Sequence, residues 1–225
     1  AVRELEEHRD GHEVGDRGHD GRVVGENLAE VVAHDLRDYT EDKHKTVDDT
    51  PYGGGAGMIF KPEPLAKAIE DVREDSETPV IYMTAEGRRL DQERANAFSL
   101  KDRVILLCGH YRGIDERIRE KYVTDELSIG DYVLSGGELA ALVLMDAVIR
   151  LIPGAIGDAE SALNDSFQNG LLDAPWYTRP REFEGMVVPE TLLNGDHEKI
   201  AQWRADQALE RTRIRRPDLL EDQAE

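Results

Sequence analysis

Short apolar runs separated by polar, glycine-bearing turns dominate the chain from about residue 31 onward. "PVIYM" at 79–83 and "RVILLCG" at 103–109 are uninterrupted apolar runs, and a turn follows each of them. Runs of this kind are typical of strands buried on both faces of a parallel sheet. A third segment, 127–137, reads as extended chain with turns. The pattern predicts an α/β fold built on a parallel sheet.

Three segments have the composition and spacing of helices. Residues 64–74 place apolar side chains at helical spacing, and Glu138–Ile152 is nearly all apolar before it stops at Pro153 and Gly154. Residues 196–220 repeat apolar positions at roughly helical intervals and form a small C-terminal helical unit. The alternation of helices with apolar strands supports the same α/β class.

Composition changes along the chain indicate four parts. Residues 1–28 are rich in charge and poor in apolar side chains, so we expect no well-packed strand there. The polar, turn-rich stretch after Gly154 indicates a linker. We therefore expect an atypical, poorly ordered N-terminal segment, an α/β domain, a linker and a helical C-terminal domain, at 1–29, 30–157, 158–173 and 174–225.

The chain of 225 residues carries a formal net charge of −20. Taken alone, this charge disfavours a nucleic-acid partner, because phosphate binding needs a basic surface. A salt-adapted protein, however, is acidic over its whole surface whatever it binds. The basic residues do cluster once, at Arg211, Arg213, Arg215 and Arg216 in "RTRIRRP".

The cysteine count and the absence of long apolar stretches indicate the cellular compartment. Cys108 is the single cysteine, so no disulfide within the chain is possible and a reducing compartment is expected. The apolar stretch 139–152 contains two charged residues and is too short to span a bilayer. The first residues do not have the pattern of a signal peptide. We predict a cytoplasmic protein without a membrane partner.

Three glycine-bearing loops are the candidate site. Ligands of parallel sheets bind beyond the carboxyl ends of the strands, so the loops 84–88, 109–113 and 128–137 could converge on one pocket. Dinucleotide and P-loop fingerprints are absent, and His34 and His44 are not spaced like metal ligands. From the residues alone, Arg150 reads as a helix-end side chain and Asp165 as a turn or cap residue.

Seven phrases in order carry a family resemblance: "TVDDTPYGGGAGM", "CGHYRGIDERI", "SIGDYVLSGGELA", "IPGAIG", "DSF…GLLDAPWYTRP", "VPETLLNGDH" and "QALERTRIRRPDLL". Over about residues 30–220 the chain resembles the bacterial tRNA (guanine-N1)-methyltransferases, members of the knotted SPOUT methyltransferases. The resemblance implies a parallel sheet with a deep C-terminal trefoil knot, formed by the segment like 128–137, and a helical C-terminal domain that binds tRNA.

The resemblance also implies the reaction. The methyl group of S-adenosyl-L-methionine is transferred to N1 of the guanine at position 37, next to the anticodon, in the anticodon stem-loop of tRNA. A homodimer shares each active site between its subunits, and the helix like Glu138–Ile152 forms much of their interface. A requirement for Mg²⁺ stays open, and no protein ligand to a metal is implied.

Site residues follow from the motifs by resemblance. Asp165 matches the general base that removes the N1 proton, and Arg150 matches the arginine that holds the guanine. The implied cofactor contacts are Gly55, Gly109, Tyr111, Gly113, Ser128, Ile129, Gly130, Tyr132, Leu134, Gly136 and Gly137.

This chain departs from the family pattern at three places. Arg112 stands where the family often has glutamate, Ala85 stands where it usually has proline, and residues 1–28 lack the family's opening apolar strand. Three alternatives therefore stay open. They are a knotted methyltransferase of other RNA specificity, an inactive RNA- or cofactor-binding relative, and a generic α/β nucleotide-binding protein.

Overall fold

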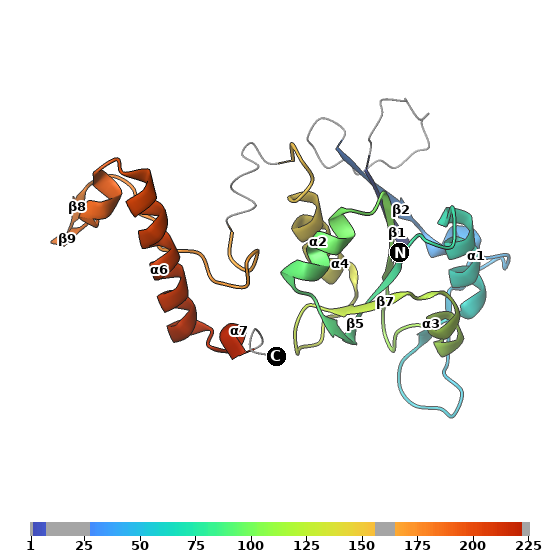
Figure 1. Ribbon diagram of the computed structural model, residues 1–225. Helices are drawn as coiled ribbons and strands as arrows, with labels where there is room; N and C mark the ends of the chain where they lie inside the picture. Colours follow the sequence, from blue (N-terminus) through green and yellow to red (C-terminus); the bar gives the residue numbers. More distant parts are fainter. Residues whose placement is uncertain (1, 8–27, 156–164, 222–225) are drawn as a thin grey trace. The chain divides into compact units, whose positions relative to one another are not determined.

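The chain folds into two compact units, Ala1–Gly157 and Asp158–Glu225. The computed structural model describes residues 2–7, 28–155 and 165–221 (Figure 1). No helix among these residues has the length and apolarity needed to cross a bilayer.

A five-stranded sheet with the order β2-β1-β6-β5-β7 forms the centre of the first unit. Strand β5 lies between β6 and β7 and runs parallel to both, which confirms the predicted α/β class with a parallel sheet. Strand β1 pairs antiparallel with β2 and β6. The sheet strands are β1 (Val2–Glu7), β2 (Ala29–His34), β5 (Val80–Arg89), β6 (Arg103–Cys108) and β7 (Asp125–Ser128).

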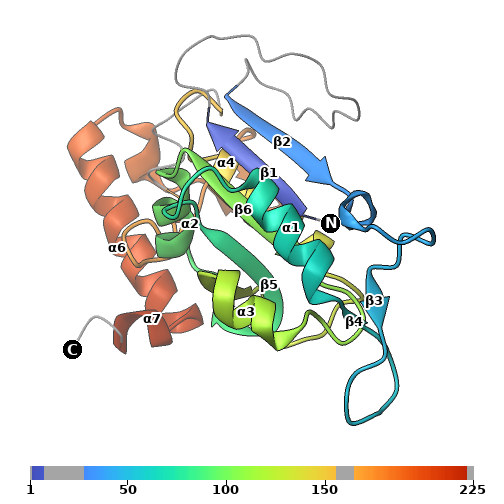
Figure 2. The same cartoon turned by 90° about the vertical axis from the view of Figure 1, so that its right-hand side faces the viewer.

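Helices cover both faces of this sheet. Figures 1 and 2 show α1 (Pro62–Val72) and α3 (Glu116–Tyr122) on one face, with α2 (Gln92–Ser99) and α4 (Glu138–Ile149) on the other. A short hairpin of β3 (Asp48–Asp49) and β4 (Ile59–Phe60), and the 3-10 helix η1 (Leu36–Tyr39), complete the described part of the unit.

The first half of β5 and most of β6 are apolar because both faces of the sheet are covered there. Val80 and Tyr82 of β5 belong to the core cluster under α1 and α3, whereas Ile81 and Met83 belong to the cluster under α2 and α4. Successive side chains of a strand point to opposite faces, so one uninterrupted apolar run supplies two cores. This is the physical reason why 79–83 and 103–109 read as buried strands.

Local signals fix where the helices begin. Pro62, the first residue of α1, lacks the amide proton that a first helical turn leaves unpaired anyway. Asp91 caps α2 by accepting a hydrogen bond from the Arg94 amide at 2.9 Å, and Asp115 caps α3 in the same way. The predicted helix 64–74 is confirmed as 62–72, and the predicted helix 138–152 begins at Glu138 as expected and ends three residues early, at Ile149.

Strand β1 corrects one expectation. We expected no strand within residues 1–28, but Val2–Glu7 pairs along both of its edges, for example Leu5 with Val31 and with Val104. Backbone hydrogen bonds to two neighbours stabilise a strand whose own sequence is mostly charged, and composition alone does not report this. Residues 8–27 lie outside the described part of the chain.

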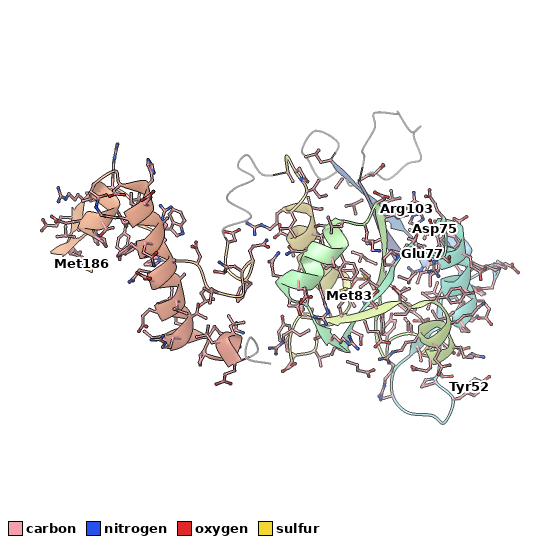
Figure 3. The ribbon with its side chains drawn as sticks, in the orientation of Figure 1. Tyr52, Asp75, Glu77, Met83, Arg103 and Met186 are labelled. Atoms are coloured by element: carbon pink, nitrogen blue, oxygen red, sulfur yellow. The ribbon has the colours of Figure 1, made fainter. Side chains whose placement is uncertain are left out.

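The second unit is built around the long helix α6 (His197–Arg215). A two-stranded hairpin, β8 (Glu182–Phe183) with β9 (Met186–Val187), precedes it, and Met186 lies at this hairpin (Figure 3). The 3-10 helix η2 (Glu190–Leu193) leads into α6, and the short α7 (Asp218–Glu221) follows it. The predicted helical segment 196–220 is confirmed as α6 and α7.

A buried threonine fastens the chain before the hairpin to α6. Thr212 is fully buried, its hydroxyl donates to the Ala208 carbonyl at 2.7 Å, and it accepts a hydrogen bond from the Leu172 amide at 2.9 Å. The segment 165–172 is therefore held by the packing of its own unit.

We expect Thr212→Val to destabilise the second unit by about 1–3 kcal/mol, because the Leu172 amide then loses its acceptor inside the protein. Both tryptophans of the chain, Trp176 and Trp203, lie in this unit, so their fluorescence during urea unfolding reports on it. Thr212→Ser is the matched control because it keeps the hydroxyl. Equal unfolding free energies for the valine and serine variants would contradict the proposed role of the hydrogen bond.

Candidate active site

One pocket opens where the carboxyl ends of β5, β6 and β7 meet. Three segments line it, in agreement with the expectation that the glycine-bearing loops converge. Its lining residues are Tyr82, Met83, Thr84, Ala85, Gly109, His110, Tyr111, Arg112, Gly113, Leu127, Ser128, Ile129, Gly130, Tyr132, Val133, Leu134, Ser135, Gly136, Gly137 and Ala140.

Main-chain atoms approach one another closely in the pocket wall. A Cβ on Gly137 would lie 2.8 Å from the Cα of Cys108, a contact that real side chains do not make. A Cβ on Gly109 or Gly113 would lie 2.9 or 2.7 Å from the Tyr82 hydroxyl. Glycine at 137 therefore permits a close approach of two main-chain segments, and glycine at 109 and 113 leaves room for the Tyr82 hydroxyl.

Hydrogen bonds fix the segment 128–137 against its neighbours. The Leu90 amide donates to the Ser128 carbonyl at 2.8 Å, and the Gly137 amide donates to the Gly109 carbonyl at 2.9 Å. The Ser128 hydroxyl accepts from the Gly130 amide at 3.2 Å and closes the first turn. The segment is therefore anchored at both ends and its middle lines the pocket.

The predicted cofactor contacts come together here with one exception. Ten of the eleven predicted residues are among the pocket lining, and Gly55 is not. Gly53, Gly54 and Gly55 all have positive φ, and a Cβ on any of them would meet nothing within 4 Å. They belong to an exposed loop on which Tyr52 points outward (Figure 3).

Arg112 joins this exposed loop to the pocket. Its Nε donates to the Ala56 carbonyl at 2.7 Å, and its backbone amide donates to the Met58 carbonyl at 3.0 Å. Two further backbone bonds link Phe60 to Gly113 and Asp115. Arg112 thus has a structural partner of its own, and it holds the end of the glycine-rich loop.

Sequence reasoning missed a His–Glu pair at the pocket. His110 lines the pocket, and its Nε2 lies 2.6 Å from Oε1 of Glu138, the first residue of α4. An isolated bridge between His110 and Gly136 sets this register. The two residues are 28 positions apart, so only the adjacency of "CGH" and "SGGE" in space could have revealed the pair.

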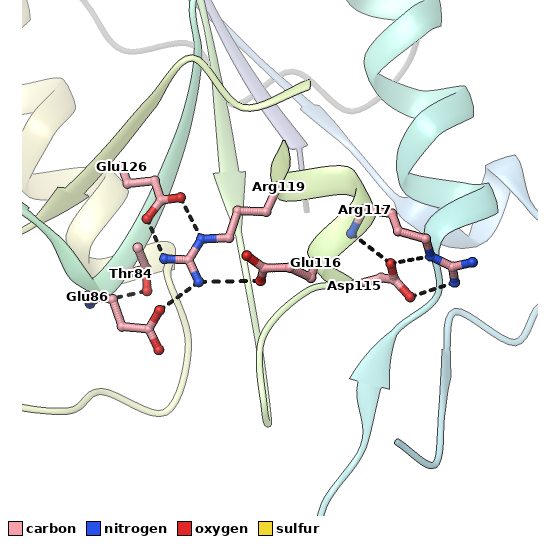
Figure 4. A network of polar contacts seen from close by, with 7 residues as sticks. All are labelled: Thr84, Glu86, Asp115, Glu116, Arg117, Arg119 and Glu126. Carbon is pink, nitrogen blue, oxygen red and sulfur yellow. Dashed lines mark hydrogen bonds and ion pairs between the residues drawn. The ribbon is translucent and has the colours of Figure 1, made fainter. Parts of the chain in front are cut away.

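A second missed feature is the Arg119 cluster, in which Arg119 contacts Glu86, Glu116 and Glu126 (Figure 4). Arg119 on α3 makes a bidentate ion pair with Glu126 of β7, and its Nη1 lies 2.6 Å from Glu86 on the exposed half of β5. Glu126 precedes pocket residue Leu127, and Glu86 follows pocket residue Ala85. Arg119 therefore ties together two neighbouring strands, β5 and β7, that both contribute residues to the pocket lining.

The two predicted catalytic residues belong to different units. Arg150 is the C-cap residue of α4, where its amide donates to the Asp146 carbonyl at 3.2 Å. Asp165 begins a turn in the second unit, and its carbonyl accepts from the Gln168 amide at 3.4 Å. These positions match the helix-end and turn locations expected from the residues alone. Among the described residues, no group of three or more histidine, cysteine or carboxylate side chains could hold a metal ion.

A family model and the curated relatives all point to the same family of methyltransferases. A sequence model of the family tRNA (Guanine-1)-methyltransferase TrmD matches residues 14–222, so β1 precedes the matched span. A tRNA (guanine-N(1)-)-methyltransferase of Chlorobaculum tepidum is 58% identical over 199 residues, covering 88% of this chain and 86% of the relative. The enzyme of the same name from Bacteroides fragilis is 55% identical over 202 residues, covering 89% and 90%.

The Arg119 cluster makes a pH-dependent prediction. The hydrogen bonds and charge of Arg119 hold the pKa of Glu126 below its usual value, so the pair stabilises the fold above about pH 4.5 and loses this effect as pH falls through the lowered pKa. We expect Arg119→Met to cost about 1–3 kcal/mol of unfolding free energy at pH 7 and less near pH 3.

Urea unfolding of the wild type and variant at both pH values measures this difference. Arg117→Met is the matched control, since Arg117 lies on the same helix and pairs with Asp115 at the surface, where an ion pair contributes about 0–1 kcal/mol. An Arg119→Met cost that is the same at both pH values would show that Glu126 is not the partner that matters.

Proposed function

The chain belongs to the tRNA (guanine-1)-methyltransferase family, and we propose that it methylates N1 of the guanine at position 37 of tRNA. The observation that carries this proposal is the identity of 52–58% with curated relatives over most of both chains. The glycine-walled pocket at the carboxyl end of the sheet agrees with it.

The pocket residues fit the methyl donor. S-adenosyl-L-methionine supplies an electrophilic methyl group on a sulfonium centre. Its adenosine and amino-acid parts need backbone donors and acceptors together with apolar surface, and the glycines of 109–113 and 128–137 beside Ile129 and Leu134 provide both. The methyl group moves by in-line displacement, so the fixed backbone of these loops contributes through positioning.

We infer a trefoil knot in the segment 128–137. Strand β5 pairs with Leu127 twice, through Met83 and again through Arg88, with residues 84–87 looped out between. A Cβ on Gly87 would lie 2.5 Å from the backbone of Glu126, so the looped-out chain crosses β7 at contact distance. Such a crossing, followed by the hydrogen bonds from Leu90 and Gly137, favours a chain that is threaded at this point.

Asp165 is the proposed general base. Guanine N1 carries a proton and is a poor nucleophile until the proton leaves, and a carboxylate placed at N1–H accepts that proton. The negative charge then spreads toward O6, where the Arg150 guanidinium stabilises it. Thr212 and the turn at 165–170 give Asp165 a fixed support within its unit.

Two copies of the chain complete each site in this proposal. Helix α4 buries one side in its own unit but leaves Leu139, Leu142 and Val143 exposed by 59%, 47% and 47%. A second copy of the chain would cover this apolar face. Asp165 would then act at the pocket of the partner subunit.

The substrate contacts the second unit through arginines. Arg211, Arg213, Arg215 and Arg216 lie at the end of α6, and two of them already pair with carboxylates, Arg213 with Glu210 and Arg216 with Asp218. We propose that the C-terminal unit binds the anticodon stem-loop and that the guanine enters the pocket of the first unit.

The test of function is methyl transfer from labelled S-adenosyl-L-methionine to a tRNA transcript with guanine at position 37. We expect transfer to N1 with the wild-type protein and none when that guanine is replaced. In the same assay Asp165→Asn should lower turnover by about a hundred- to ten-thousand-fold, because it keeps the shape but cannot accept the proton.

The residual rate of Asp165→Asn should rise with pH, and its affinity for S-adenosyl-L-methionine should stay close to that of the wild type. Arg150→Ala should weaken both tRNA binding and turnover. Methylation of another nucleotide would indicate a different RNA specificity. A folded Asp165→Asn protein with normal turnover would exclude the proposed base.

Subunit sharing predicts complementation. Asp165→Ala removes the base, and Gly136→Arg blocks the pocket, since even a Cβ there would lie 2.6 Å from the His110 ring. Each variant should be inactive alone, while a heterodimer of the two has one intact site and regains activity. Mixing either variant with the double variant is the control and should give no recovery. Inactive, verified heterodimers would contradict sharing, provided that Gly136→Arg folds.

A further inference from the structure

The second unit contains a cavity of about 510 Å³ that has no assigned role. The chain before the hairpin, Val188 just after β9, η2 and the first half of α6 line it. Its lining residues are Pro175, Trp176, Tyr177, Thr178, Arg179, Arg181, Val188, Leu192, Leu193, Ile200 and Arg204. The volume lies within the range of about 300–1,000 Å³ that small-molecule sites have.

The charge of this lining is opposite to that of the chain. Three arginines and no carboxylate line the cavity, although the chain has 48 acidic and 28 basic residues. Arg181 also pairs with Glu190, which lies outside the lining, at 3.8 Å. An arginine-lined cavity in so acidic a chain favours an anionic occupant.

Aromatic side chains stand at the same cavity. Trp176 is 63% exposed and Tyr177 is 50% exposed, which is unusual for side chains of this size. The indole nitrogen of Trp176 donates to Asp173, so the ring is held by its edge. Arg204 lies 4.3 Å from the centre of the Trp176 ring, and the Tyr177 ring packs against Trp203 with centroids 6.3 Å apart.

The combination identifies the chemistry of the occupant. Exposed aromatic faces and arginine planes bind unstacked nucleobases, and the adjacent guanidinium groups bind the phosphate that each base carries. Val188, Leu192 and Ile200 add an apolar floor that suits a base but not a phosphate alone. A small anion would leave this floor and the Trp176 face unused.

We propose that this cavity holds one unpaired nucleotide of the tRNA substrate, with its base against Trp176 and its phosphate at Arg179 and Arg204. The proposal rests on the proposed function, because it takes tRNA as the substrate. A paired nucleotide is stacked within a helix and does not enter such a cavity. The cavity is thus a recognition subsite apart from the methyl-donor pocket.

Fluorescence provides the first test. The chain has two tryptophans, so Trp203→Phe leaves Trp176 as the sole one. We expect a tRNA transcript to quench its emission, because a stacked base contacts the ring. A blunt RNA duplex, which has no unpaired nucleotide, should leave the Trp176 emission unchanged. Unchanged Trp176 emission in a protein that binds tRNA by gel shift would overturn the proposal.

Affinity provides the second test. Trp176→Ala should weaken tRNA binding by about 5- to 150-fold, the loss expected for one stacked base. Trp176→Phe keeps an aromatic face and should recover most of the affinity. Arg204→Gln should also weaken binding, whereas Lys199→Gln removes the same charge from the same helix outside the cavity and should have little effect.

The outcomes separate this proposal from the proposed function. If the wild type methylates guanine 37 and folded Trp176→Ala binds tRNA as tightly as the wild type, the subsite is wrong and the function stands. If tRNA quenches the Trp176 emission of the Trp203→Phe variant while the wild type transfers no methyl group, the function is wrong and the subsite stands. Equal losses for Arg204→Gln and Lys199→Gln would show a general charge effect and also contradict the subsite.

Discussion

Two contacts between backbones govern the rest of the structure. Gly137 lies against Cys108 and Gly87 lies against Glu126 so closely that a Cβ at either glycine would come within 2.8 Å of main-chain atoms. Residues 84–87 of β5 and the segment after β7 can approach the neighbouring strands this closely only because Gly87 and Gly137 carry no side chain. A wall made in this way presents amides and carbonyls, and it recognises a ligand by shape and hydrogen bonding.

The supports of this wall lie one layer further out. Arg119 fixes β5 to β7 from α3, and Arg112 fixes the glycine-rich loop to 111–115. The apolar sheet beneath contributes rigidity through two cores, so a loop with little apolar contact of its own still has a defined shape. In the second unit, a buried polar side chain likewise holds a loop in place: Thr212 accepts a hydrogen bond from the segment that begins at Asp165.

Much of this arrangement can be predicted from the sequence. The features that could not be predicted depend on contacts between residues far apart in the chain. Buried strands at 79–83 and 103–109, the helices and the converging loops follow from local periodicity and turn residues. The Arg119–Glu126 and His110–Glu138 pairs do not, because each depends on the register between distant elements. Strand β1 was missed because its pairing compensates for its composition. Gly55 matches a family motif, yet its loop is held at the Arg112 end and extends outward at the glycines.

The acidic character of the chain is compatible with a polyanionic substrate when charge is considered locally. Binding free energy depends on the groups within about a Debye length of the phosphates, which is roughly 10 Å at 0.1 M salt. The arginines of the second-unit cavity and of the end of α6 are within that distance of any RNA bound there, whereas most of the 48 carboxylates need not be. The carboxylates on the rest of the surface repel RNA, so an RNA that docks there binds more weakly. In the proposed mode of tRNA binding, a net charge of −20 therefore opposes non-specific binding and favours docking where arginine and aromatic side chains occur together.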